Sequence, residues 1–271
     1  MKTLYLSDLD GTLLHSNAQV SDYTTSVVNR VVQSGGLFSY ATGRSHIKAA
    51  PIIAGLNIEI PVICHNGALT FDRHGKMLSK NLFTRDEVDF IASTMNKHDI
   101  LPIIYAYING VNNFSYIKHH YSGGMRKFLD DRINNPRRRE VHTLEELFQG
   151  DVFDVICIEE AEKLDAISTA FSMYSDSITY GKDFYSDDLW FEMTAKNATK
   201  GIAALELKSM LACDKLVVFG DNMNDISMFS VADECYATAN AVHELKEIAT
   251  AVIESNDDDG VAKWLEKNVL I

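Results

Sequence analysis

Two aspartates, Asp8 and Asp10, end an apolar run in the segment LYLSDLDGTLL, which covers residues 4–14. The run predicts a buried strand, so a pair of negative charges at its end needs a chemical explanation. A turn explains Asp10 beside Gly11, because Asp-Gly is common in turns, but it does not explain Asp8. Two nearby carboxylates can divide catalytic work, with one as an ionised nucleophile or metal ligand and the other as a general acid. The pair is therefore a candidate catalytic centre.

A second acidic segment, GDNMND, follows the apolar run KLVVF and places Asp221 at the end of another predicted buried strand. A turn with a helix cap at Asn224 or Asp225 would also explain this segment. Asp221 would nevertheless face Asp8 and Asp10 across the end of a shared sheet. Carboxylates that converge without a cation repel one another, whereas Mg²⁺ binds carboxylate and water oxygens in an octahedral shell. The acidic residues therefore predict a magnesium site.

Two further segments complement these acids. Lys200, in NATKG, begins a predicted helix, where its charge opposes the helix dipole unless it is aimed at an anion. Thr42 and Gly43, in ATGR, follow the predicted strand LFSYA and supply a hydroxyl and a backbone that an anion can approach closely. An exposed lysine and an ordinary turn are the alternatives. Together the four segments predict a phosphate site in which Mg²⁺, a lysine and backbone amides surround an aspartate nucleophile.

The elements that must position these residues alternate between strand and helix. The predicted strands cover residues 3–8, 37–41, 61–68 and 215–221, and the predicted helices begin near Ser21, Ser45 and Thr199. Strands separated by helices need crossover connections and form a parallel sheet. Ligands of such a sheet bind beyond the carboxyl ends of its strands, where the four segments fall.

The middle of the chain breaks this alternation. It has paired strands and a helix that begins at a capping box, TRDE, which is the pattern of a small α+β domain. We therefore expect an inserted domain at residues 83–188 and a core domain formed by residues 1–82 and 189–271. Within the insert, NNPRRRE is predicted to be a turn whose arginines, 137–139, are solvated.

Composition limits the class of protein and its partners. A chain of 271 residues with 46% hydrophobic residues can bury a sizeable core, and a net charge of −13 argues against nucleic acid and anionic membrane as partners. No run approaches membrane-spanning length, and no signal peptide is expected. The four cysteines form no CxxC pair and predict buried thiols in a reducing cytoplasm. The expected partner is a small phosphorylated metabolite; no oligomeric state is predicted.

These residues resemble the haloacid dehalogenase (HAD) superfamily of phosphotransferases, whose four motifs occur in order as DLDGT, ATGR, Lys200 and GDNMND. The insert, with VICHNGA before it, resembles the large type IIB cap of the Cof-like hydrolases. The resemblance extends over the whole chain and implies a Rossmann-like α/β core with a parallel sheet and an inserted α+β cap domain. It also implies a magnesium-dependent phosphatase that hydrolyses small phosphate monoesters, with sugar phosphates as the leading substrates.

The resemblance implies a role for each motif residue. Asp8 attacks phosphorus and forms an aspartyl-phosphate, while Asp10 protonates the leaving group and then activates water. Mg²⁺ is bound by the Asp8 carboxylate, the Asp10 main-chain carbonyl and Asp221. The residues that hold the phosphoryl group are Thr42, Gly43 and Lys200, with Asn224 as a further phosphate contact.

Several neighbouring residues keep more than one interpretation. Arg44 either binds substrate or pairs with a carboxylate, and Asp225 orients either Lys200 or a metal-bound water. Asn66 and Gly67 either border the cap or form a plain turn. Four residues near a predicted helix start are candidates for substrate contact by polarity alone, against a solvated helix start: His119, His120, Tyr121 and Arg126.

Two other functions are compatible with the same motifs. A phosphomutase of the phosphomannomutase type has a similar core and cap, returns phosphate to a sugar hydroxyl and needs a bisphosphate activator. A non-catalytic module that binds a phosphate ligand is the third possibility. The presence of Asp8, Asp10, Lys200 and Asp221 argues against the module, because such a protein has no need of a nucleophile.

Overall fold

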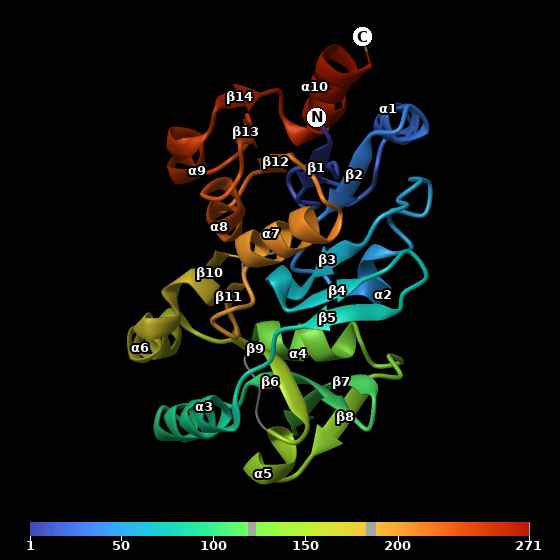
Figure 1. Ribbon diagram of the computed structural model, residues 1–271. Coiled ribbons are helices and arrows are strands. Elements are labelled where there is room, and N and C mark those ends of the chain that lie inside the picture. Colours follow the sequence, from blue (N-terminus) through green and yellow to red (C-terminus); the bar gives the residue numbers. More distant parts are fainter. Residues whose placement is uncertain (119–122, 183–187, 271) are drawn as a thin grey trace. The chain divides into compact units, whose positions relative to one another are not determined.

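Two compact units make up the chain (Figure 1). The computed structural model describes residues 1–118, 123–182 and 188–270. The core domain joins Met1–Lys80 to Ala198–Ile271, and the inserted domain is Asn81–Asn197. None of the helices in the described part of the chain is long and apolar enough to cross a membrane.

A five-stranded parallel sheet with the order β14-β13-β12-β1-β2 forms the centre of the core domain. Its strands are β1 (Thr3–Ser7), β2 (Leu37–Tyr40), β12 (Lys215–Gly220), β13 (Glu234–Thr238) and β14 (Ala251–Ile253). The α-helices described in this domain are α1 (Asp22–Gln33), α2 (His46–Ala49), α7 (Lys200–Met210), α8 (Ile226–Phe229), α9 (His243–Ile248) and α10 (Gly260–Val269). The predicted parallel sheet is confirmed.

Side chains that alternate along the strands pack on both faces of this sheet. On one face, Leu6 of β1 and Val218 of β12 share a buried cluster with Leu207 of α7. On the other, the Trp264 ring of α10 lies 5.1 Å from the Phe219 ring, measured between centroids. With both faces covered by apolar packing, the ends of the strands are left as the place where polar side chains can serve a ligand.

A small antiparallel sheet, β3-β4-β5, follows β2 in the chain. Its strands are β3 (Val62–Cys64), β4 (Leu69–Phe71) and β5 (Met77–Lys80). A single parallel bridge between Ala41 and Ile63 links β3 to the end of β2. The third predicted strand is therefore present, but its regular pairing is with β4 rather than with the parallel sheet.

The inserted domain is built on a six-stranded sheet with the order β10-β11-β9-β6-β7-β8. The strands are β6 (Ile103–Ile108), β7 (Val111–Ile117), β8 (Arg138–Val141), β9 (Asp151–Ile158), β10 (Ile178–Lys182) and β11 (Leu189–Thr194). The α-helices described are α3 (Arg85–Lys97), α4 (Gly123–Asp130), α5 (Leu144–Leu147) and α6 (Ala161–Ala170). The predicted capping box begins α3: Thr84 N donates to the Glu87 carboxylate at 2.7 Å, and Glu87 N donates to Thr84 Oγ1 at 3.3 Å.

The inserted domain extends further along the chain than the sequence indicates. The sequence places residues 189–197 in the core domain, whereas β11 pairs with β9 on one side and with β10 on the other. Phe191 and Met193 of this inner strand are fully buried, at 0% exposed. Because β11 completes the sheet of the insert, the compact unit ends at Asn197.

The arginine run in the insert is not a solvated turn. Arg138–Val141 is β8 and pairs in parallel with β7, and Arg137 is only 6% exposed. Arg138 Nε donates to the Tyr116 hydroxyl at 2.7 Å, and its guanidinium lies 4.9 Å from the centre of that ring. Long arginine stems can cover aromatic surface while the charged group finds a polar partner, so a charge-rich segment can form a strand.

Of the four polar residues that the sequence offers as candidates for substrate contact, the structure describes one. His119, His120 and Tyr121 lie outside the described residues. Arg126 lies on α4 and is exposed. Its exposure agrees with the solvated alternative for this position.

The point where the chain leaves the core domain lies close to the point where it returns. Lys80, the last core residue before the insert, pairs with Leu69. Two residues earlier, Gly67 packs against Thr199, since a Cβ built on Gly67 would lie 2.3 Å from the Thr199 carbonyl oxygen. A short linker can therefore connect Lys80 to Ala198.

We expect the core domain to fold without the insert. Replacement of residues 81–197 by a Gly/Ser linker of about eight residues should preserve cooperative thermal unfolding and the circular dichroism of an α/β sheet. The physical reason is that the core domain has its own buried cluster on each face of its sheet. Loss of the cooperative transition in the shortened protein, with the full-length protein as control, would show that the core depends on the insert.

Candidate active site

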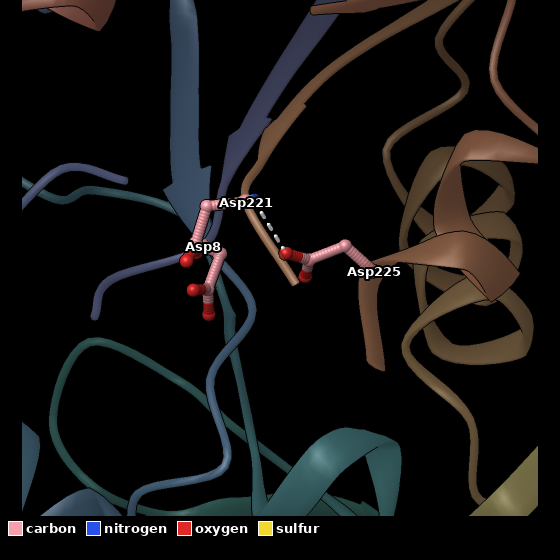
Figure 2. Close-up of side chains that lie close together, drawn as sticks. All are labelled: Asp8, Asp221 and Asp225. Carbon is pink, nitrogen blue, oxygen red and sulfur yellow. Dashed lines mark hydrogen bonds between the residues drawn. The ribbon is translucent and has the colours of Figure 1, made fainter. Parts of the chain in front are cut away.

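The aspartates predicted from the two apolar runs meet at the carboxyl ends of β1 and β12, as Figure 2 shows. The strands are parallel neighbours, with Ser7 opposite Phe219, and Asp8 continues the ladder by donating its N–H to the Phe219 carbonyl at 2.9 Å. Asp221 follows directly after β12. Both side chains are buried, with Asp8 5% exposed and Asp221 4% exposed. Because both side chains are buried at the carboxyl ends of the strands, they do not form a solvated acidic turn.

Lys200 lies in the middle of these acids. Its Nζ is 2.6 Å from Asp8 Oδ1 and 2.7 Å from Asp225 Oδ1, and the residue is 1% exposed. Thr199 caps α7 by accepting the Ile202 N–H on its hydroxyl at 3.2 Å, which fixes where the helix begins. The lysine that the sequence places against the helix dipole is therefore directed at carboxylates.

Asp225 is fully buried and holds both the lysine and the turn after β12 in place. Its Oδ2 accepts the backbone N–H group of Asp221 at 2.8 Å (Figure 2) and that of Asn222 at 3.1 Å, while its Oδ1 accepts from Lys200. A Cβ on Gly220 would lie 2.6 Å from Asp225 Oδ2, so the turn needs glycine there. The sequence left two interpretations of Asp225, and the structure shows the one in which this residue contacts Lys200.

The carboxylates form a group that suits a divalent cation. One oxygen from each of Asp8, Asp221 and Asp225 lies within 4.8 Å of the others. Thr12 Oγ1 donates to Asp221 Oδ1 at 2.8 Å and orients that carboxylate. Because both oxygens of Asp225 already accept hydrogen bonds, Asp8 and Asp221 are the better placed ligands. A donor set made of carboxylates fits Mg²⁺, a hard cation that binds oxygen.

Asp10 is held by Arg44 in the core domain. Arg44 Nε donates to Asp10 Oδ2 at 2.7 Å and its Nη2 donates to Asp10 Oδ1 at 2.6 Å, a two-point pair that fixes the plane of the carboxylate. The Asp10 side chain is 25% exposed, so this pair lies at the border of the buried cluster. The pairing with a carboxylate, one of the two interpretations of Arg44, is therefore present.

The residues of the predicted phosphate loop lie beside the acids. Thr42 is fully buried, and its Oγ1 accepts the Arg44 N–H at 3.1 Å. A Cβ on Gly43 would lie 3.3 Å from both polar atoms of the Asn66 side chain. Asn66 Oδ1 in turn accepts from Asn224 Nδ2 at 3.0 Å. The loop after β2, the turn after β3 and the segment after β12 thus come together at one place.

Burial dominates the electrostatics of the site. Desolvation raises the pKa of Asp8 well above its usual value; Lys200 opposes this rise and the neighbouring aspartates add to it. Desolvation, and then the charge of Asp225, raises the pKa of Asp221 to about 7. Burial alone would lower the pKa of Lys200, but its ion pairs with Asp225 and Asp8 outweigh burial and raise that pKa. The lysine therefore stays charged, whereas burial favours the protonated forms of Asp8 and Asp221.

Two contacts of the first acidic loop have no counterpart among the sequence-based expectations. Thr12, two residues after Asp10, orients Asp221, and its place inside DLDGT is the signal that could have found it. Asn240 Nδ2 donates to the Gly11 carbonyl at 2.8 Å, which ties this loop to the segment after β13. No local pattern marks Asn240, because its partner lies 229 residues away in the chain.

Known proteins resemble the chain over almost its full length. The 5-amino-6-(5-phospho-D-ribitylamino)uracil phosphatase YwtE of Bacillus subtilis is 24% identical over 286 residues, which cover 96% of each chain. A solved haloacid dehalogenase-like hydrolase from B. subtilis matches with a TM-score of 0.79 at 24% identity, over 99% of this chain and 100% of that one. The HAD subclass IIB sugar phosphatase BT4131 matches with a TM-score of 0.77 at 22% identity, over 100% of each. These structures share the fold, so the predicted α/β core with an inserted α+β domain is confirmed.

A family-wide sequence pattern decides the affiliation. The pattern of the haloacid dehalogenase-like hydrolases matches residues 5–265, which include both parts of the core domain and the whole insert. The phosphatase names of relatives such as YwtE support the expected enzyme class. The predicted family is confirmed: the chain belongs to the haloacid dehalogenase-like hydrolases.

Proposed function

We propose that the protein is a magnesium-dependent phosphatase that hydrolyses phosphate monoesters of small sugar-like metabolites through an aspartyl-phosphate on Asp8. The observation that carries this proposal is the buried contact of Lys200 with Asp8 and Asp225 at the strand ends. YwtE, a relative over nearly the whole chain, is named for a substrate with a phosphorylated ribityl group, which supports a polyol or sugar ester here. The four cysteines are free thiols, which suits action in the cytoplasm.

In the first step an Asp8 carboxylate oxygen attacks phosphorus, and the bond between phosphorus and the ester oxygen breaks. Lys200 stands against Asp8 and would offset negative charge on the phosphoryl group as it moves between the two oxygens. Thr42, Gly43 and Asn224 would hold the phosphoryl oxygens through a hydroxyl, backbone N–H groups and a side-chain amide. Such positioning and charge neutralisation account for most of the acceleration of phosphoryl transfer.

Asp10 handles the protons in both steps. In the first step it gives a proton to the departing ester oxygen. In the second step it takes a proton from water as the water attacks phosphorus, and the bond from phosphorus to Asp8 breaks to release inorganic phosphate. Arg44 donates hydrogen bonds to both carboxylate oxygens of Asp10. Asp10 must therefore leave at least one of these hydrogen bonds before it can carry a proton, so Arg44 is proposed to set when the acid is available.

The raised pKa of Asp8 supports the requirement for a cation. A protonated Asp8 is a poor nucleophile, and burial together with the nearby aspartates favours its protonated form. Asp8, Asp221 and the Asp10 main-chain carbonyl are proposed as the protein ligands. When bound there, Mg²⁺ supplies positive charge that favours the ionised carboxylates and neutralises the phosphoryl group.

Removal of divalent cations should abolish phosphate release. Protein treated with EDTA and freed of chelator is expected to release no phosphate from a panel of sugar and polyol phosphates, and addition of Mg²⁺ should restore release. Inorganic phosphate is measured with time, and the untreated protein serves as control. Full activity in the metal-free preparation would remove the cation from the mechanism.

The cation-free protein should become less stable as pH rises. The pKa of Asp221 is raised to about 7 in the folded chain, so its contribution to stability is complete below the unfolded value near 3.8 and is lost as pH rises through about 7. The thermal unfolding temperature in EDTA is therefore expected to fall between about pH 5 and pH 8. The Asp221→Asn variant, which lacks the titrating carboxyl, should show a smaller fall. An equal fall in both proteins would contradict the assignment.

A phosphorylation experiment should distinguish the roles of Asp8 and Asp10. Asp8→Asn removes the attacking oxygen's charge, so turnover should fall roughly 10⁴-fold or more and no phosphoenzyme should form. Asp10→Asn keeps the nucleophile, and an activated ester with a good leaving group needs little acid help, so Asp8 should become phosphorylated and stay so. Intact-protein mass after a brief incubation and acid quench measures the adduct. An adduct on the Asp8 variant, or normal turnover by either variant, would refute the roles.

A further inference from the structure

The turn after β3 is an unusual piece of backbone. Three consecutive residues have positive φ: His65 at 48°, Asn66 at 51° and Gly67 at 104°. All three are buried. A residue other than glycine in this region is strained by about 1 kcal/mol or more, and such strain persists where the surroundings fix it. Two such residues in succession, beside the candidate site, indicate that contacts with the surrounding segments hold the turn in this conformation.

The backbone of this turn is bonded to the predicted phosphate loop. Asn66 N donates to the Thr42 carbonyl at 3.0 Å, and His65 N donates to the Arg44 carbonyl at 3.2 Å. The first carbonyl belongs to the peptide that precedes Gly43 and the second to the peptide that follows Arg44, so the turn holds the chain before and after Gly43. The course of the loop after β2 therefore depends on the left-handed conformation of residues 65–67.

Residues of the turn also contact the start of α7 and the segment after β12. Gly67 packs so closely on the start of α7 that a Cβ would lie 2.3 Å from the Thr199 carbonyl oxygen and 3.0 Å from Lys200 N. Asn66 Oδ1 accepts from Asn224 Nδ2 at 3.0 Å. This bond uses one of the two N–H groups of a planar amide, so it also fixes the direction of the second.

We propose that Asn66 is a positioning residue for phosphoryl binding: it sets the amide of Asn224 and the loop at Gly43 so that their donors converge on one anion. The proposal rests on the proposed function, in which these donors bind the phosphoryl group. Asn66 acts through Asn224 and the loop, and it is not assigned a contact with substrate. A pocket whose donors are arranged in advance binds the transition state better than one that must be arranged on binding.

Asn66→Gly separates the side chain from the backbone strain. Glycine adopts positive φ without strain, so the variant keeps the turn and loses only the amide. A matched control exists in the insert, where Asn109 has a φ of 52° and is exposed in a hairpin turn. Asn109→Gly makes the same chemical change away from the core domain's acids.

The experiment measures orthovanadate binding by calorimetry with Mg²⁺ present, together with kcat and KM for an activated ester. We expect Asn66→Gly to weaken vanadate binding and lower kcat/KM by a similar factor, roughly 10- to 100-fold, with unchanged thermal unfolding temperature. Asn109→Gly should match the wild type. The double variant Asn66→Gly with Asn224→Ala should lose no more than Asn224→Ala alone, because glycine keeps the backbone bond to the loop and the lost amide acts through Asn224.

The outcomes distinguish this inference from the proposed function. An active wild type with a fully active Asn66→Gly variant, or losses that multiply in the double variant, would overturn the positioning role alone. A wild type that binds vanadate but releases no phosphate would overturn the phosphatase proposal, and the binding data would still judge Asn66. A wild type that does not bind vanadate would overturn both, because no phosphoryl pocket would then exist to be positioned.

Discussion

The burial of Lys200 among carboxylates is the interaction on which the site depends. Removing an ion from water costs several kcal/mol even in a relaxed protein, and a partner offsets this only when its geometry is good. Asp225 meets that requirement, since one oxygen accepts from the lysine at 2.7 Å and the other accepts two backbone N–H groups. When Asp8 and Asp221 are also ionised, the group carries more negative charge than Lys200 can offset. A buried group of this kind is weak evidence for stability, so its explanation lies in the ligands that it can bind.

Close approach between backbones makes the site rigid. A Cβ on Gly201 would lie 2.2 Å from the Ser227 carbonyl oxygen, and one on Gly67 would lie 2.3 Å from that of Thr199. The first contact packs the start of α7 on α8, and the second packs the turn after β3 on the start of α7. Glycine at these places is required by packing, and the result is a set of loops whose mutual positions leave little room to vary.

The insert has its own sheet and its own core, so it is a structural unit distinct from the domain that carries the buried acids. Aromatic side chains support that core: the rings of Phe171 and Phe191 have centroids 6.1 Å apart, and those of Phe128 and Trp190 are 5.6 Å apart. The ion pairs of Lys200 with Asp8 and Asp225 are made within the core domain. A fold of this kind can therefore vary one domain while the residues around Lys200 stay as they are.

The sequence by itself determined the features that depend on neighbours in the chain. The period of apolar residues located β1 and β12, the TRDE box located the start of α3, and the order of the four motifs indicated the family. Motif positions at strand ends also indicated that Asp8 and Asp221 would be neighbours, because parallel strands end at a common edge.

The tertiary structure alone decided the pairings. Lys200 and Asp8 are 192 residues apart, and Asn224 and Asn66 are 158 apart, so no local pattern reports their contact. The same holds for the pairing of Arg44 with Asp10 and for the membership of β11 in the inserted sheet. Local sequence specifies which backbone form a segment prefers, whereas partners are chosen when the whole chain packs, since burial and hydrogen bonding across the fold then outweigh local preference.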